Sequence, residues 1–353
     1  MPKLTITILN SWYTDVTRGS GTARSINSLI AGLRRRGFGV QLLGAERTSD
    51  PHQRRIRFNA RLAQQPQLVR GDLVFGFDAD GYRWAVRRDR SVPYLVFIKG
   101  MRADEARFER GSVKKELLLE AQWERQNCQL ADRVVTTSRY LKQQLIRQYG
   151  LPADKVTIIP ECIALRDWQA RPSKPHRTTV GILTVARMYP RKNIELLLRA
   201  ARSLVRRHRV SFDIVGGGPQ WPLIRQRVKQ WRLQPYLSLH KEITDQQLRQ
   251  RYRQADVFCL PSRQEGFGIV FLEAMAAGLP IVALAAGAVP EVVGDAGLLV
   301  GNSVRELRAG LECLITDAAL RQRLGARAKQ RVKRFDERRV FQRYRTLIQR
   351  YTP

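Results

Sequence analysis

The sequence predicts an α/β fold made of two doubly wound domains, each built on a parallel sheet. Three observations predict it. Short apolar runs alternate with helical patterns, this alternation stops once near the middle of the chain, and it then starts again. With 353 residues, 43% of them hydrophobic, the chain is long enough to bury two separate cores.

The first half contains six short apolar runs that are typical of buried strands. They are Leu4–Leu9, Val40–Leu43, Leu73–Phe77, Tyr94–Ile98, Arg133–Thr136 and Val156–Ile159. Amphipathic helical patterns lie between several of them, at Thr22–Arg36, Val113–Leu130 and Arg139–Tyr149. Strands that alternate with helices in this way form a parallel sheet covered on both faces.

A polar segment that contains two prolines, residues 166–178, separates the two halves as a linker does. The second half has strands at Thr179–Val185, Ser211–Val215, Leu237–Leu239, Val257–Leu260 and Ile281–Leu284. Its helices are expected at Ile194–Arg207, Trp221–Trp231, Asp245–Arg253 and Val270–Ala277. We therefore expect one domain over 1–165 and a second over 179–335. Since ligands of such sheets bind beyond the carboxyl ends of the strands, two facing domains would form a cleft at the linker.

The cysteines and the apolar segments indicate where the protein works. Four scattered cysteines form neither a CxxC pair nor a Cys/His cluster, which favours a reduced, cytoplasmic setting without zinc or a disulfide framework. The apolar run Leu4–Leu9 is too short for a signal peptide, and no segment approaches the roughly 20 apolar residues of a membrane span. We expect a soluble or at most surface-bound protein.

The net charge of +32, from 63 Lys and Arg against 31 Asp and Glu, leaves two interpretations open. Such a field attracts polyanions, among them nucleic acid, acidic glycans, anionic lipids and phosphorylated substrates. The charge is also spread along the chain rather than gathered in one patch, which is typical of arginine on solvated faces.

The most informative stretch is Pro261–Pro280, in which an apolar strand leads through a glycine-containing loop into a helix. Glycines let the backbone approach a ligand, and the free N–H groups of a helix start bind phosphate. Glu265 and Glu273 flank this loop. Carboxylates would repel a phosphate, so sugar or ribose hydroxyls are their natural partners.

At this point the chain resembles the retaining glycosyltransferases of family 4, which have the GT-B fold. The Glu-x7-Glu pattern of that family is met by Glu265 and Glu273, with Gly278-Leu279-Pro280 and Pro290-Glu291 downstream. The resemblance implies that Glu265 holds the donor sugar and Glu273 the donor ribose. It also implies that the loop backbone meets the diphosphate or the sugar, at Gly266, Phe267, Gly268 and Ile269.

The resemblance extends upstream. Thr184–Asn193 is similar to the family segment whose Arg and Lys bind the diphosphate, which implies this role for Arg187 and Lys192. Gly217 lies in a glycine turn that the family places near the nucleotide. Gly19 and Gly21 stand where the family has a glycine loop close to the donor phosphate and the acceptor, although a plain turn remains open.

Two positions depart from the family pattern. Lys99-Gly100 follows a strand where many members have His, and Glu161-Cys162 stands where many have Asn-Gly. A lysine donates but cannot copy the donor–acceptor pair of a neutral imidazole. Lys99 is assigned to the acceptor side, and Arg102, Asp104 and Glu105 follow directly and are assigned there too. The helix expected at Asp336–Tyr351 corresponds to the family's last helix, which implies that 336–353 packs back on the first domain.

Asp78-Ala79-Asp80 raises the question of a metal, because Asp-x-Asp after a strand binds a divalent cation in the other major glycosyltransferase fold. Three-letter matches are common, and Arg187 and Lys192 already serve the phosphate. A polar loop is the preferred interpretation. We expect no metal and no cofactor, the nucleotide-sugar being a co-substrate.

The sequence therefore predicts a metal-independent, retaining glycosyltransferase with Arg187, Lys192 and Glu265 as its catalytic residues. No side chain stands out as a nucleophile, so a front-face mechanism assisted by the leaving phosphate is preferred. The expected partners are a nucleotide-sugar donor, a glycan, lipid-linked or small-molecule acceptor, and the inner face of an anionic membrane, but not nucleic acid. Two alternatives remain, a non-catalytic basic binding protein and a sugar-nucleotide epimerase or phosphorylase. The nucleotide, UDP, GDP or ADP, stays open.

Overall fold

The computed structural model describes residues 4–13, 16–45, 50–168 and 178–351 and divides the chain into two compact units. The first unit comprises Met1–Glu161 and Glu337–Pro353, and the second comprises Cys162–Asp336. Most of the expected linker, residues 169–177, lies outside the described residues. None of the helices described combines the length and the apolar character needed to cross a bilayer.

The first unit is built on a parallel sheet of six strands in the order β2-β1-β3-β4-β5-β6. Both β3 and β4 are buried along their whole length, as expected of central strands covered on both faces. The strands are β1 Thr5–Asn10, β2 Gly39–Gly44, β3 Leu73–Phe77, β4 Tyr94–Ile98, β5 Arg133–Thr136 and β6 Val156–Ile158.

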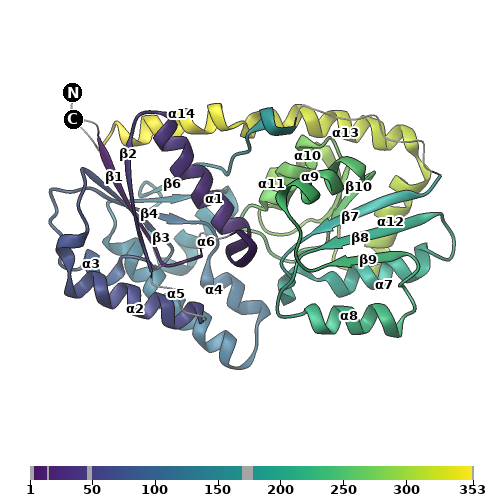
Figure 1. Cartoon of the computed structure of the whole chain (residues 1–353), viewed down its shortest axis with the longest axis horizontal. Helices are drawn as coiled ribbons and strands as arrows, with labels where there is room; N and C mark the ends of the chain where they lie inside the picture. Colours follow the sequence, from purple (N-terminus) through teal and green to yellow (C-terminus); the bar gives the residue numbers. More distant parts are fainter. Residues whose placement is uncertain (1–3, 14–15, 46–49, 169–177, 352–353) are drawn as a thin grey trace. The chain divides into compact units, whose positions relative to one another are not determined.

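Helices cover both faces of this sheet because the chain moves from β1 to β2 in one direction and from β3 to β6 in the other. Crossover connections are right-handed, so the reversal places the connecting helices on opposite faces. Figure 1 shows α1 and α14 on one side of the sheet and α2, α3 and α5 on the other. The helices are α1 Val16–Arg35, α2 Pro51–Gln64, α3 Tyr82–Ala85, α4 Arg102–Glu105, α5 Gly111–Leu130, α6 Arg139–Tyr149 and α14 Glu337–Ile348.

In this unit one local expectation was wrong and one helix was missed. Gly19 and Gly21 lie in the first turns of α1, which begins six residues before the predicted Thr22, and not in a loop. Each glycine lowers the stability of a helix by about 1 kcal/mol relative to alanine. The tertiary packing of a long helix can offset this loss. Helix α2 was missed, although Asp50 caps it by accepting from His52 N and Gln53 N and Pro51 opens it, a signal readable in the sequence.

The second unit repeats the architecture with the strand order β12-β11-β10-β7-β8-β9, again all parallel. Its strands are β7 Val180–Val185, β8 Val210–Val215, β9 Leu237–His240, β10 Val257–Leu260, β11 Ile281–Leu284 and β12 Gly297–Val300. The predicted fold class, α/β with two doubly wound parallel sheets, is confirmed.

Helices α7 and α8 cover one face of the second sheet and α9, α10 and α11 the other (Figure 1). Helix α12 packs beside α7, and α13 packs against α10. The helices are α7 Ile194–Leu204, α8 Trp221–Gln230, α9 Asp245–Gln254, α10 Ile269–Ala276, α11 Val289–Val293, α12 Val304–Thr316 and α13 Ala318–Val332.

The direction of strand order reverses once in each sheet, between β1 and β3 in the first and between β7 and β10 in the second. At such a switch point, the loops that follow the two strands leave toward opposite faces. The residues directly after β1, β3, β7 and β10 are therefore the ones that each fold places best for contact with a ligand.

Helix α14 packs on α1 at a site where only glycine fits. A Cβ built on Gly32 would lie 1.9 Å from the ring carbon Cζ of Phe341, whose side chain is buried. Arg36 lies over the same ring at 4.2 Å, and Arg35 pairs with Glu337 at 2.9 Å. Gly32 thus lets the last helix approach the first one closely.

We expect Gly32→Ala to lower the free energy of unfolding by about 1–2 kcal/mol. Displacement of the buried Phe341 ring outweighs the gain of about 1 kcal/mol from alanine in a helix. Thermal or urea unfolding measures the change. Gly44→Ala, at the end of β2, is the control for alanine without a clash, since no atom lies within 4 Å of a Cβ built there. Equal stability of the two variants would contradict this packing.

Candidate functional site

The predicted donor residues of the second unit follow neighbouring strands. Arg187 and Lys192 come after β7, the glycine turn comes after β8, and Glu265 comes after β10. Because β8, β7 and β10 are adjacent and parallel, their carboxyl ends lie at one edge of the sheet. The structure therefore brings the segments that contain these residues together at the switch point of the sheet.

The glycine turn after β8 fits against the segment after β7 only because it lacks side chains. Gly216 and Gly218 have φ angles of 126° and 143°, and their Cβ atoms would lie 2.1 Å from the Ala186 oxygen and 2.7 Å from the Met188 nitrogen. Met188 N donates to Gly217 O at 2.8 Å, and Gln220 N donates to Met188 O at 2.9 Å. The turn thus fixes the backbone course on both sides of Arg187.

Lys192 and Glu265 form an ion pair, with Nζ 2.5 Å from Oε1. Lys192 ends a short 3₁₀ turn, Pro190–Lys192, and Glu265 is buried, with 6% of its surface exposed. The backbone fixes Glu265 as well, since its carbonyl accepts from Ala288 N at 2.9 Å. The ammonium and the carboxylate are therefore held together in a position set by two loops.

Three neighbours that the sequence analysis did not assign join these two loops. Arg263 N donates to Arg191 O at 2.8 Å, and Arg263 Nη2 donates to Pro190 O at 2.9 Å. Arg191 Nε donates to Gln264 Oε1 at 3.1 Å. These arginines bond to backbone and amide oxygens and so hold the loop that contains Lys192 against the loop that contains Glu265.

Glu273 lies on α10, in the helix that Gly268 begins with a φ of 86°. Its side chain is 3% exposed, and Oε2 accepts a hydrogen bond from Tyr252 Oη at 2.8 Å. Tyr252, on α9, is fully buried and was missed, because nothing in the sequence links it to a residue 21 positions away. Phe267 is buried too and packs edge-on against Phe335.

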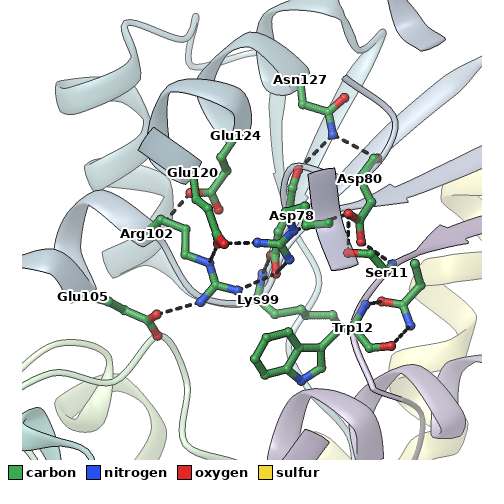
Figure 2. A network of polar contacts seen from close by, with 12 residues as sticks. Ser11, Trp12, Asp78, Asp80, Lys99, Arg102, Glu105, Glu120, Glu124 and Asn127 are labelled. Carbon is green, nitrogen blue, oxygen red and sulfur yellow. Dashed lines mark hydrogen bonds and ion pairs between the residues drawn. The ribbon is translucent and has the colours of Figure 1, made fainter. Parts of the chain in front are cut away.

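In the first unit the motif Asp78-Ala79-Asp80 lies in the turn between β3 and α3, a polar loop as expected, and both aspartates are buried. Asp80 is 0% exposed and accepts from Ser11 N at 2.6 Å and from Ser11 Oγ at 2.7 Å. Asn127 donates to the backbone oxygens of both aspartates. Since Ser11 follows β1 and the aspartates follow β3, this network lies at the switch point of the first sheet (Figure 2).

Arg55 supplies the positive charge that this buried network needs. Its Nε lies 3.3 Å from Asp80 Oδ1, and its Nη1 lies 2.5 Å from Glu120 Oε2. Burial works to raise the pKa of Glu120, but the charges of Arg55 and Arg102 outweigh it and lower the pKa to about 2. No sequence signal pointed to Arg55 or Glu120.

Arg102 is held on several sides at the partly buried edge of the same network. Its guanidinium pairs with Glu105 at 2.9 Å and Glu120 at 3.2 Å, and it lies 5.7 Å from the ring centre of Trp12. Figure 2 shows Trp12 and Glu105 on either side of it. The Arg102 N–H donates to Glu124, whose pKa is raised to about 8 because the carboxyl is buried and close to Asp78.

Asp104 lies in a different environment from that expected for an acceptor contact. It is 0% exposed, and its carboxylate accepts from Tyr140 Oη at 2.6 Å and from Arg107 Nη1 at 3.1 Å. Its side chain links α4 to α6 through Tyr140 and does not face solvent.

The two departures from the family pattern contact each other. Lys99 Nζ lies 2.9 Å from Glu161 Oε1, and Ser25 Oγ donates to Glu161 Oε2 at 2.6 Å. Lys99 and Glu161 are both largely buried, with 7% and 12% of their side-chain surfaces exposed. Glu161 therefore ties Lys99, at the end of β4, to helix α1.

Within the described ranges no group of three His, Cys, Asp or Glu side chains could hold a metal ion. The acidic residues of the first unit pair instead with Arg55 and Arg102, as the ion pairs above record.

Two family models match the chain. "Glycosyltransferase Family 4" matches residues 19–167, and "Glycosyl transferases group 1" matches residues 167–331. A D-inositol 3-phosphate glycosyltransferase from Kineococcus radiotolerans is 32% identical over 241 residues, which is 60% of this chain and 55% of that protein. The matched regions span between 35% and 62% of the length of the curated relatives.

Solved structures share the fold of the whole chain. Sucrose-phosphate synthase from Thermosynechococcus elongatus superposes with a TM-score of 0.83 at 20% identity, covering 98% of this chain and 99% of that one. HepE from Anabaena, solved in complex with UDP and glucose, gives 0.73 at 17% identity, covering 98% and 99%. With two parallel doubly wound sheets and both family models matched between residues 19 and 331, the chain belongs to the group 1 and family 4 glycosyltransferases of the GT-B fold.

Proposed function

We propose that the protein is a retaining glycosyltransferase that moves a sugar from a nucleotide-sugar to an acceptor hydroxyl. The observation that carries the proposal is the Lys192–Glu265 ion pair beside the glycine turn, at the switch point of the second sheet. A partly buried ammonium suits a diphosphate, and a neighbouring carboxylate suits sugar hydroxyls. Both family models and the UDP-bound neighbours of the same fold support this use.

In this proposal Arg187 and Lys192 bind the diphosphate and Glu265 holds the donor sugar. Charge develops on the diphosphate as the bond to the sugar breaks, so fixed cations act most strongly in the transition state. Glu273 accepts from a ribose hydroxyl, and Tyr252 holds its carboxylate in place at 2.8 Å. The donor in this proposal is a nucleoside diphosphate sugar.

The transfer is proposed to follow a front-face course. The acceptor oxygen bonds to the anomeric carbon on the face that the diphosphate leaves, and a phosphate oxygen takes the hydroxyl proton. The products are the glycoside, with retained configuration, and the nucleoside diphosphate. The scheme needs no protein nucleophile and no metal, since Arg187 and Lys192 meet the developing charge.

For the acceptor we propose the edge of the first unit formed by Trp12, Arg102 and Glu105, with Lys99 nearby. The aromatic face can pack on the apolar face of a sugar ring, and Glu105 can accept from its hydroxyls. The carboxylates of this network, Asp78, Asp80, Glu105 and Glu120, outnumber its arginines, Arg55 and Arg102. This balance favours a neutral sugar as the reacting group of a glycan or lipid-linked acceptor.

The proposal extends to a cytoplasmic location with peripheral contact to an anionic membrane. The net charge of +32 supports attraction to anionic lipid, and a lipid-linked acceptor would be met there.

The first expected result is that a nucleoside diphosphate stabilises the protein in EDTA. A ligand at 100 times its dissociation constant adds about 2.7 kcal/mol to the free energy of unfolding. Thermal shift with UDP, GDP and ADP measures this and identifies the base. Stabilisation that appears only with Mn²⁺ or Mg²⁺ would refute the metal-independent scheme.

Substitutions at the donor residues should act in separable ways. Glu273→Gln replaces one acceptor oxygen by a donor, so we expect a loss of donor affinity of about ten- to a hundredfold, from about 1.5–3 kcal/mol per charged hydrogen bond. Arg187→Ala and Lys192→Ala should lower turnover more than donor binding. Titration with donor and single-turnover rates distinguish the two effects.

The double variant Arg187→Ala/Lys192→Ala should be non-additive, because both cations serve one diphosphate. Arg199→Ala is the matched control, an exposed arginine that pairs with Glu195 on α7. Wild-type turnover in the double variant would overturn the proposed donor site.

At the acceptor edge we expect Glu105→Gln to raise the acceptor KM about tenfold, through one lost charged hydrogen bond. The donor affinity should not change. Steady-state kinetics with neutral and phosphorylated sugars test the balance of charge. Preference of the wild type for the phosphorylated acceptor would contradict the proposed acceptor chemistry, although it would leave the donor site intact.

A further inference from the structure

Helix α5 changes character along its length. Its second half buries Glu120, Ala121, Glu124, Asn127 and Cys128 against the first unit. Its first half, residues 111–119, buries none of its residues, and all of them are exposed except the half-buried Leu117. The first half is thus a helical segment whose side chains face solvent.

This exposed segment is unusually apolar. Val113, Leu118 and Leu119 are 47%, 44% and 40% exposed. In the part of the chain that the structure describes, the other large apolar side chains exposed to this degree are Val86 and Tyr236, which lie elsewhere. Single apolar side chains are normal on a protein surface, but three within seven positions indicate a surface with a partner.

Two basic side chains, followed by Glu116, lie between Val113 and the leucines. Lys114 and Lys115 are exposed, and each lies one helical turn before an exposed leucine, Leu118 and Leu119. Arg110 directly precedes the helix and is exposed as well. Lysine and arginine side chains can keep their charges among lipid head groups while their aliphatic stems lie along apolar chains.

We infer that residues 110–119, here called the α5 tip, dock on a membrane surface that contains anionic lipid. The inference rests on the proposed membrane contact and not on the proposed transfer reaction. An anionic bilayer offers an apolar phase and negative charge together, which matches the mixture of leucines and lysines. A second copy of the chain fits less well, since two molecules of charge +32 repel each other.

Helix α5 connects the docking surface to the proposed acceptor edge. Glu120 and Glu124, which hold Arg102, follow the α5 tip directly. At 1.5 Å per residue, Glu124 lies about 8 Å along the helix from Leu119. A docked tip would therefore hold the acceptor edge close to the lipid surface, where a lipid-linked sugar is presented.

Co-sedimentation of the full chain with vesicles tests the inference. We expect binding to phosphatidylcholine vesicles that contain phosphatidylglycerol, weaker binding as salt rises, and little binding to phosphatidylcholine alone. Leu118→Gln/Leu119→Gln and Lys114→Glu/Lys115→Glu should each weaken binding about tenfold. The melting temperature and its shift with UDP, GDP or ADP should stay as in the wild type.

The controls change an exposed apolar side chain and a basic pair outside the α5 tip. Tyr236→Gln removes an exposed apolar side chain of the second unit, and Arg206→Glu/Arg207→Glu changes the net charge as much as the lysine pair does. The inference would be overturned if the control variants lost as much vesicle binding as the α5 tip variants, or if the wild type did not bind anionic vesicles. A change of oligomeric state in the leucine variant, without vesicle binding by the wild type, would assign the surface to a second copy. Vesicle binding without a shift by any nucleoside diphosphate would refute the donor proposal alone.

Discussion

The reversal of strand order in each parallel sheet is the constraint on which both polar clusters depend. Between β7 and β10 it brings together the loops that contain Lys192 and Glu265, which are 73 residues apart, as an ion pair at 2.5 Å. Between β1 and β3 it brings Ser11 to Asp80, 69 residues away. Because crossovers are right-handed, the loops that follow the two adjacent strands leave toward opposite faces of the sheet. The space that opens between them lies at the carboxyl ends of the strands, and the side chains of both loops line it. The same reversal of strand order thus places a polar cluster in each unit, and the two clusters differ in chemistry.

The clusters differ in how they balance charge. In the second unit a single ammonium meets a single carboxylate, and the arginines nearby bond to backbone and amide oxygens. In the cluster of the first unit the carboxylates of Asp78, Asp80, Glu105 and Glu120 outnumber Arg55 and Arg102, which is unusual in a chain of net charge +32. Burial is tolerated because Arg55 reaches both Asp80 and Glu120. Where this compensation is incomplete, as at Glu124, burial raises the pKa to about 8, and the carboxyl holds its proton near neutral pH. A bound proton thus neutralises the buried carboxyl of Glu124, whereas guanidinium groups balance the charge of Glu120.

The two departures from the family pattern, Lys99 and Glu161, compensate each other because their side chains form an ion pair. Taken separately, Lys99 replaces a neutral imidazole and Glu161 a neutral amide by a charged side chain. Together they form an ion pair at 2.9 Å that Ser25 completes. A largely buried lysine without a carboxylate would be costly, and so would the carboxylate without the lysine. The end of β4 therefore presents a cation held by its partner, and this favours a different contact with the substrate from that of a neutral imidazole.

The sequence by itself determined the fold class, most strand positions and the Glu265–Glu273 motif, because these depend on local apolar periods and on fixed spacing. It failed at Gly19 and Gly21, where long-helix packing outweighs the local cost of glycine, and it missed Tyr252 as the partner of Glu273. The donor roles drawn from the resemblance remain predictions. Only the tertiary structure decided which charges meet, that Asp80 is buried and that Lys99 pairs with Glu161. The physical reason is that ion pairs and burial depend on distances across the sheet, which strand order sets and which no local pattern of residues encodes.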